Sequence, residues 1–104
     1  MDLAAGHLAA LDYIAARKGV KRWNLGTGDG SSVLEVLAAF SKAAGKEIPY
    51  EFAPRRPGDA AVSYADPAAA QADLGWRAGR SLDDMCRDHW NWQKQNPQGY
   101  AADA

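Results

Sequence analysis

The sequence predicts a small, mostly helical α+β domain with four helices and a few short strands. Three observations indicate this class. Apolar residues recur at helical spacing in four stretches, and turn-forming glycine or proline residues lie at most of their ends. Between the helical stretches stand three short runs that contain aromatic residues and read as extended chain. A length of 104 residues fits one domain with a modest hydrophobic core.

The first helix is predicted over residues 2–16, and Asp2 is placed to cap its start. Its apolar face is made of four residues at helical spacing, Leu3, Leu8, Leu11 and Ile14. Lys18 and Gly19 end this helix. Residues 22–25 then have the character of a short strand that would join a larger parallel sheet.

The second helix follows a glycine-rich turn over residues 26–30. Phosphate-binding loops also contain such turns, but the spacing matches neither a P-loop nor a dinucleotide fingerprint, which favours a tight turn that needs positive φ. Ser32 and Glu35 form a Ser-x-x-Glu capping box, and Gly45 stands at the position expected of a helix end.

The second half of the chain predicts two more helices after two short strands, residues 48–52 and 61–64. Asp66 as N-cap and Pro67 at the first helical position start the third helix, over residues 68–74. Gly75 closes it, and Trp76 is expected to fold back onto its end. Ser81 and Asp84 start the last helix, which Asn96 and Pro97 end.

Composition excludes several classes of function. The net charge is −1, so no broad surface for nucleic acid or for a membrane is expected. No run reaches the roughly 18 apolar residues of a membrane span, and Asp2 stands where a secretory signal would carry a cation. Cys86 is the single cysteine, which fits a reducing compartment. We therefore expect a cytoplasmic protein.

No set of residues points to catalysis. The chain has no nucleophile signature, no close pair of carboxylates beside a plausible cleft and no cluster with metal-ligand spacing. His7 is expected to be packed or half-exposed, His89 is expected to pack, and Cys86 is expected to be an inert thiol on the buried side of its helix. The sequence therefore supports binding and no catalytic step by this chain alone.

Residues 53–59, Ala-Pro-Arg-Arg-Pro-Gly-Asp, are the best candidate for a binding loop. Two prolines fix φ around Arg55 and Arg56, and Gly58 allows a tight turn before Asp59. An arginine fork suits a phosphate, and a carboxylate nearby suits the hydroxyls of a ribose or sugar. The alternative that these residues leave open is a solvated arginine-rich turn capped by Asp59.

Six stretches, in order and over nearly the whole chain, resemble the UDP-glucose 4-epimerase family. The most specific is the ending, Trp-x-Trp-Gln followed by Asn-Pro-x-Gly-Tyr. The stretches are residues 2–7, 24–28 with 32–34, 53–59, 64–67, 74–76 and 90–100. The match is to the carboxyl-terminal third of the family, which is a branch of the extended short-chain dehydrogenases. The resemblance implies part of an α/β NAD-binding epimerase, incomplete without an N-terminal Rossmann domain.

The family resemblance also implies roles. Arg56 is similar to the arginine that pairs with the UDP phosphates, and Asp59 to the carboxylate that accepts from ribose hydroxyls. Ser63 stands at the position that controls the size of the sugar pocket. A small residue there leaves room for an N-acetyl group, so UDP-glucose, UDP-galactose and UDP-N-acetylhexosamines are all expected as ligands of the parent enzyme.

NAD is expected in the parent enzyme only, and no cofactor is expected for this chain alone. The family's Gly-x-x-Gly-x-x-Gly motif and catalytic Tyr-x-x-x-Lys pair are absent, and the nearest run, from Tyr13, ends in Arg17. We expect residues 1–100 to be the UDP-sugar-binding portion and residues 101–104 to be a disordered tail. The partner of the UDP-sugar-binding portion would be an N-terminal Rossmann domain or a second copy of the chain.

Two alternatives stay open. One is a fragment of a related nucleotide-sugar dehydratase or decarboxylase, which the Trp-x-Trp-Gln ending disfavours. The other is a non-catalytic module that associates through an unpaired strand and an apolar helix face.

Overall fold

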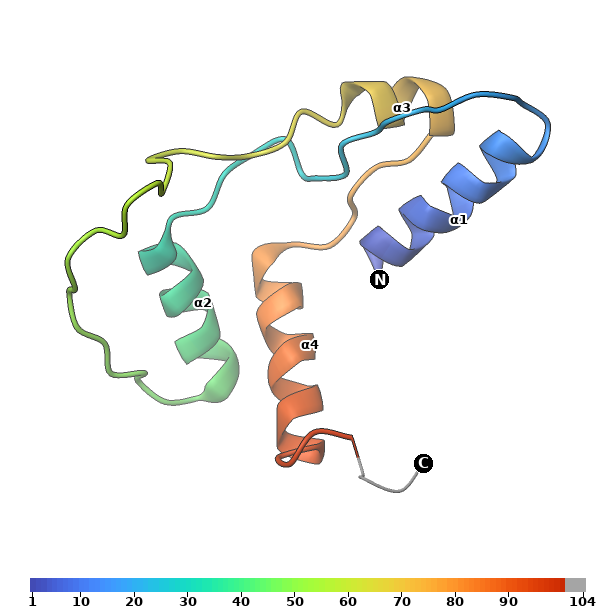
Figure 1. The fold of residues 1–104 in the computed structure, drawn as a ribbon. Helices are drawn as coiled ribbons and strands as arrows, with labels where there is room; N and C mark the ends of the chain where they lie inside the picture. Colours follow the sequence, from blue (N-terminus) through green and yellow to red (C-terminus); the bar gives the residue numbers. More distant parts are fainter. Residues whose placement is uncertain (101–104) are drawn as a thin grey trace. The chain divides into compact units, whose positions relative to one another are not determined.

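The computed structural model describes residues 1–100 and contains four helices in this part of the chain (Figure 1). They are α1 (Asp2–Ala15), α2 (Val33–Ala44), α3 (Ala68–Leu74) and α4 (Leu82–Gln95). The chain forms two compact units. Met1–Gly30 and Arg56–Gly79 make the first, in which α1 packs on α3. Ser31–Arg55 and the chain from Arg80 onward make the second, in which α2 packs on α4.

The predicted short strands are not confirmed. Residues 22–25, 48–52 and 61–64 belong to neither a helix nor a strand. A strand requires backbone hydrogen bonds to a neighbour, whereas the backbone hydrogen bonds outside helices within residues 1–100 belong to turns and helix ends. The described fold is therefore helical, with irregular connections where strands were expected. The predicted tail, residues 101–104, lies outside the described residues.

The four helices are confirmed within one or two residues, but Asp2 is not the cap of α1. Met1 occupies the N-cap position, and Asp2 is the first helical residue. The Asp2 carboxylate instead accepts a hydrogen bond from the backbone N–H of Gly79, at 2.8 Å. A contact to a residue far along the chain has thus replaced the local cap that the sequence predicted.

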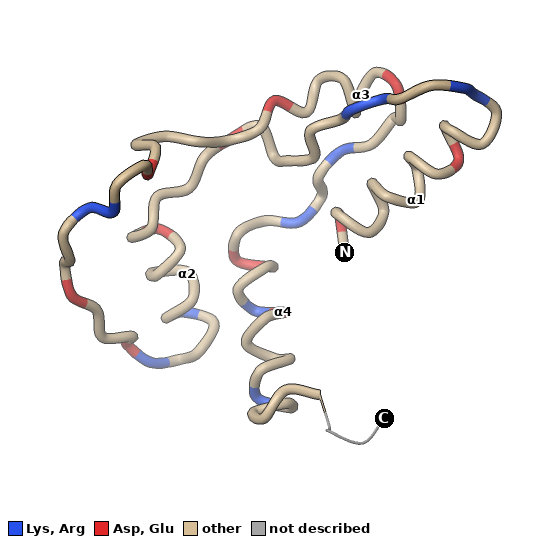
Figure 2. Tube along the Cα trace, viewed as in Figure 1, with Lys and Arg blue, Asp and Glu red and all other residues tan. Residues whose placement is uncertain are grey.

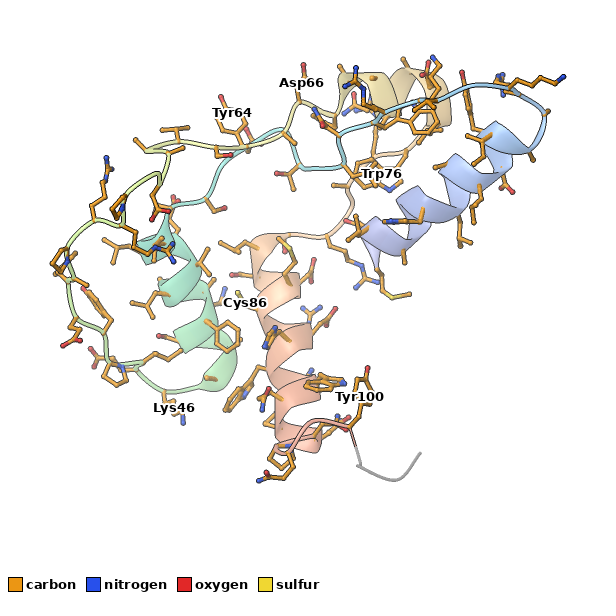
Figure 3. The ribbon with its side chains drawn as sticks, viewed as in Figure 1. Lys46, Tyr64, Asp66, Trp76, Cys86 and Tyr100 are labelled. Atoms are coloured by element: carbon orange, nitrogen blue, oxygen red, sulfur yellow. The ribbon has the colours of Figure 1, made fainter. Side chains whose placement is uncertain are left out.

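Trp76 is the main buried side chain of the first unit and folds back as predicted. Its backbone N–H donates to the carbonyl of Ala70 at 3.4 Å, and Gly75 has the left-handed φ of +62° that this reversal requires. The ring is only 7% exposed, and its Nε1–H donates to the carbonyl of Asp2 at 2.9 Å (Figure 3). Trp76 therefore ties the end of α3 to the start of α1.

Gly6 lets other residues approach α1 closely. A Cβ added at Gly6 would stand 2.5 Å from a methyl carbon of Leu25 and 3.3 Å from Nε1 of Trp76. Gly6 is itself buried. A hydrogen atom at this position thus makes room for both neighbours, a role that the sequence did not reveal.

The caps of α2 and α3 follow the predictions closely. In α2 the Ser32 hydroxyl accepts from the N–H of Glu35 at 3.2 Å, and the Glu35 carboxylate accepts from the N–H of Ser32 at 2.7 Å. Gly45 ends that helix with φ +69°. At α3 the Asp66 carboxylate accepts from the N–H of Ala68 at 2.9 Å, although Pro67 occupies the formal N-cap position.

The second unit is held by contacts between α2 and α4. Phe40 of α2 lies edge-on to the rings of His89 and Trp90, with ring centroids 5.4 and 6.4 Å apart. The Lys42 ammonium donates to the Asp83 carboxylate at 2.6 Å. Cys86 is buried on the side of α4 that faces α2 (Figure 3). His89 contacts Phe40 but is itself exposed, so the prediction that it packs is met only by this edge contact.

The apolar face predicted for α1 is not covered within its own unit. Leu3, Leu8 and Leu11 are about 60% exposed, at 61%, 64% and 59%. The residues that α1 turns toward its unit are mostly small, such as Gly6 and Ala10. None of the helices formed by residues 1–100 combines the length and apolar character needed to cross a membrane.

Replacing Trp76 by Phe tests its bond to Asp2. The change keeps an aromatic ring but removes the donor, so the partly buried Asp2 carbonyl loses its partner. We expect the free energy of unfolding of the first unit to fall by about 1–2 kcal/mol, measured by urea unfolding. Trp92→Phe is the matched control, because Trp92 is 40% exposed, and should change stability little. Equal stability of both variants would contradict the role of the bond.

The cap of α4 predicts a dependence of stability on pH. The N–H of Ser81, its hydroxyl and then Arg87 donate to the Asp84 carboxylate and lower its pKa from 3.8 to about 2. Because the folded pKa lies below the unfolded one, this stabilisation is present above the ordinary pKa and is lost as pH falls from there through about 2. Helicity of α4, followed by NMR, should decrease over that window.

The Asp84→Asn variant should show a flatter response, since its side chain does not titrate. Asp12→Asn, an exposed change in α1, should keep the wild-type response. A wild-type profile in the Asp84→Asn variant would show that another group controls the acid transition.

Candidate functional site

The predicted binding loop contains a tight turn from Arg56 to Asp59. The N–H of Asp59 donates to the carbonyl of Arg56 at 3.4 Å. Pro57 fixes φ at the second position, and Gly58 at the third has φ +85°. Proline followed by a positive-φ glycine is the arrangement that a type II turn prefers. The sequence thus predicted the turn correctly and for the right physical reason.

This turn brings the side chains of Arg56 and Asp59 together. Nε of Arg56 lies 2.9 Å from Oδ2 of Asp59, and their side chains are 84% and 46% exposed. Figure 2 shows this as blue backbone followed by red along the connection between α2 and α3. An ion pair this exposed contributes about 1 kcal/mol or less. A stronger ligand can therefore displace either partner at little cost to the fold.

Arg55 and Ser63 stand apart from that pair. Within residues 1–100 Arg55 makes no hydrogen bond or ion pair, and it belongs to the second compact unit whereas Arg56 belongs to the first. Ser63 is exposed in the irregular segment that follows the turn. No hydrogen bond joins Ser63 to Arg56 or Asp59 in the described part of the chain. The structure thus brings together two of the three predicted site residues.

The segment after the turn is positioned by the glycine-rich turn of residues 26–30. A Cβ at Gly26 would lie 3.0 Å from the Cβ of Ala65, and one at Gly30 would lie 3.3 Å from the ring of Tyr64. Gly28 has φ +86°, and so needs glycine for its own conformation. Gly26 and Gly30 thus let Ala65 and Tyr64, which follow Ser63, approach the turn closely. Those two residues occupy the space beside these glycines.

The histidines and the cysteine form no second site. Nδ1 of His7 lies 2.7 Å from the carbonyl of Leu3, within α1. Cys86 is buried, and burial raises the pKa of its thiol, which disfavours the nucleophilic thiolate. Residues 1–100 hold no group of three or more histidine, cysteine or acidic side chains that could bind a metal ion.

The ion pair between Arg56 and Asp59 is the feature that the binding-loop prediction did not include. It corresponds to the open alternative of a solvated turn capped by Asp59. Spacing was the available signal, because the ends of a four-residue turn lie close together. An arginine and a carboxylate at those ends are therefore neighbours whenever the turn forms.

Comparison with known proteins identifies relatives over nearly the whole chain. No protein-family model matches. The chain is 54% identical to the UDP-glucose 4-epimerase of Bacillus subtilis over 100 residues, which are 96% of this chain and 30% of that protein. The chain thus spans less than a third of the length of the curated relatives it matches, and the family resemblance found in its motifs is confirmed.

Two solved structures agree with this assignment. A UDP-glucose 4-epimerase from Bifidobacterium longum, in complex with NAD+ and UDP, matches with a TM-score of 0.89 and 54% identity over 95% of this chain and 29% of that one. The enzyme from Stenotrophomonas maltophila, with bound NAD and formylated UDP-arabinopyranose, matches with a TM-score of 0.86 and 44% identity over 93% of this chain and 29% of that one.

Proposed function

Since this chain is homologous to part of the UDP-glucose 4-epimerases, we propose that it is their carboxyl-terminal, UDP-sugar-binding portion. The observation that carries the proposal is the Arg56–Asp59 turn. It presents a guanidinium and a carboxylate together, exposed and joined only by a weak ion pair. The structure of a 54% identical relative holds UDP. The diphosphate of UDP suits the Arg56 guanidinium, and its ribose hydroxyls suit the Asp59 carboxylate.

Arg56 is the proposed diphosphate ligand. Its guanidinium can donate two parallel hydrogen bonds to phosphate oxygens, and each such charge-assisted bond contributes about 1.5–3 kcal/mol. The present partner of Arg56 is a single carboxylate in solvent, whose loss costs about 1 kcal/mol or less. Exchange of Asp59 for a diphosphate is therefore favourable.

Asp59 becomes available for the ribose in the same exchange. A carboxylate accepts hydrogen bonds at two oxygens, which suits the vicinal hydroxyls of a ribose. The short turn keeps Arg56 and Asp59 three residues apart, so one nucleotide can reach both. Bound UDP would separate the two charges without moving the backbone far.

The chemistry of epimerisation is proposed to lie outside this chain. The glycine-rich turn does not fit the phosphates of NAD, because Ala65 and Tyr64 occupy the space beside Gly26 and Gly30. The chain would hold UDP-glucose or UDP-galactose by the nucleotide, which leaves the hexose free to turn. Hydride transfer at C4 would then be carried out by a partner domain that binds NAD.

Ser63 is proposed to set the size of the sugar pocket. It lies four residues after Asp59, is exposed and has a small side chain. A small residue leaves space for an N-acetyl group on the hexose, so UDP-N-acetylhexosamines join the proposed ligands. Localisation in the cytoplasm is part of the same proposal, as is the galactose metabolism that this reaction serves.

Titration of UDP into the chain tests the anchor. We expect saturable shifts of the backbone amide NMR signals of residues 56–63, with weak affinity because the partner domain is absent. Arg56→Ala should abolish the shifts. Arg77→Ala, which removes another exposed arginine, is the matched control and should leave them unchanged.

Absence of specific UDP binding would contradict the proposed role of Arg56. If a folded chain shows no shifts with UDP, or if Arg56→Ala and Arg77→Ala bind alike, Arg56 does not anchor the nucleotide. A non-catalytic interaction module, which the exposed leucines of α1 favour, would then be the better account.

The role of Ser63 is tested in a chimera in which this chain replaces the matching third of the Bacillus subtilis enzyme. We expect turnover of both UDP-glucose and UDP-N-acetylglucosamine. Ser63→Tyr should lower kcat/KM for the acetylated substrate by about tenfold or more and change that for UDP-glucose little. Ser63→Ala is the control and should retain both activities. A parallel loss of both activities in Ser63→Tyr would contradict a role in selecting the sugar.

A further inference from the structure

We propose that residues 17–22, the loop that follows α1, are a docking surface for an acidic segment of another protein. Four of the chain's 12 lysine and arginine residues stand in these positions, although the net charge of the whole chain is −1. The rest of the chain is therefore acidic overall. Figure 2 shows these cations as two blue runs, one soon after α1 and one beside α3. We call residues 17–22 the basic loop, and its role does not depend on the proposed UDP site.

Contacts within the first compact unit hold two of the four cations in place. Cζ of Arg17 lies 3.8 Å from the centroid of the Tyr13 ring, and its guanidinium donates to the Tyr13 carbonyl at 3.0 Å. Nζ of Lys21 lies 3.5 Å from the Asp73 carboxylate. The hydrogen bond from Trp23, and then the charges of Lys21 and Arg17, lower the pKa of Asp73. Because these contacts fix the basic loop at both ends, less conformational entropy is lost when a partner binds.

Lys18 and Arg22 are the cations left for a partner. Both are exposed, and the side chain of neither makes a hydrogen bond or an ion pair with another residue in the range 1–100. Val20 between them is 93% exposed, and the chain turns at Gly19, where φ is +100°. The basic loop thus presents an apolar tip with an unpaired cation on each side.

Aspartate and glutamate side chains are the partner chemistry that these groups suit. A carboxylate can accept two parallel hydrogen bonds from the Arg22 guanidinium, and another can accept from the Lys18 ammonium. An apolar side chain between the two carboxylates would contact Val20. Because a single exposed ion pair contributes little, the partner must engage several cations at once. A short acidic run with one apolar residue in it meets this requirement, and its opposite charge also speeds association.

Nucleic acid and membranes suit the basic loop less well. Proteins that bind single strands stack bases on the faces of aromatic rings. Here Arg17 covers a face of Tyr13, and the Trp23 ring lies edge-on to Tyr13 with centroids 5.1 Å apart. An anionic membrane extends far beyond so short a loop and would repel the acidic remainder of the chain. An acidic peptide can follow the basic loop alone.

Fluorescence anisotropy of a labelled peptide, in which a run of glutamates flanks a leucine on each side, tests this. We expect saturable binding to the whole chain and to the chimera with the Bacillus subtilis enzyme, unchanged by saturating UDP and weakened severalfold by added salt. Changing both Lys18 and Arg22 to Gln should lower the affinity about tenfold. Changing both Arg77 and Lys94 to Gln, which removes the same charge from exposed positions elsewhere, is the matched control and should retain the affinity.

Four results would overturn the inference. Equal affinity in the two double variants would show that the basic loop does not hold the peptide. Displacement of the peptide by UDP would place it on the Arg56–Asp59 turn instead. Binding that is lost in the chimera would show that the rest of the enzyme covers the basic loop. Tighter binding of oligothymidylate or of phosphatidylserine vesicles than of the peptide would assign the basic loop to nucleic acid or to a membrane.

Discussion

Helix contacts made through small side chains are the constraint on which this structure depends. Among residues 1–100 the buried residues are Gly6, Ala39, Pro67, Ala70, Trp76 and Cys86, and all of these except Trp76 are small. Such contacts leave the larger apolar side chains, including three leucines of α1, on the outside. Burial of apolar area stabilises a fold by about 25 cal/mol per Å², and much of that area is uncovered here. Much of the apolar surface of residues 1–100 is therefore exposed.

The same arrangement separates the packed contacts of α1 and α3 from the exposed turn of residues 56–59. Trp76 and Gly6 hold α1, α3 and Leu25 together, and the glycines of residues 26–30 seat the segment that contains Ser63. The Arg56–Asp59 turn stands in solvent before that segment. Its two charges neutralise one another weakly. In the proposed complex, a diphosphate would replace Asp59 beside Arg56, and a ribose would replace Arg56 beside Asp59.

Local features of the fold could be predicted from the sequence, and contacts between distant residues could not. Ser32, Ser81, Gly45 and Gly75 act within one helical turn, and each was assigned correctly. Asp2 was not, because its carboxylate binds Gly79 far along the chain. The predicted strands do not form within residues 1–100, because a strand needs a neighbour to pair with and a local pattern does not supply one. For the site, the turn followed from Pro57 and Gly58, whereas the roles of Arg56, Asp59 and Ser63 came from the family resemblance and stay predictions.

A crystal structure of the chain grown with UDP would show whether the Arg56–Asp59 turn binds the nucleotide. We expect diphosphate oxygens within hydrogen-bonding distance of the Arg56 guanidinium, ribose hydroxyls on the Asp59 carboxylate and no remaining bond between these two side chains. UDP bound at another surface while Arg56 still pairs with Asp59 would contradict it.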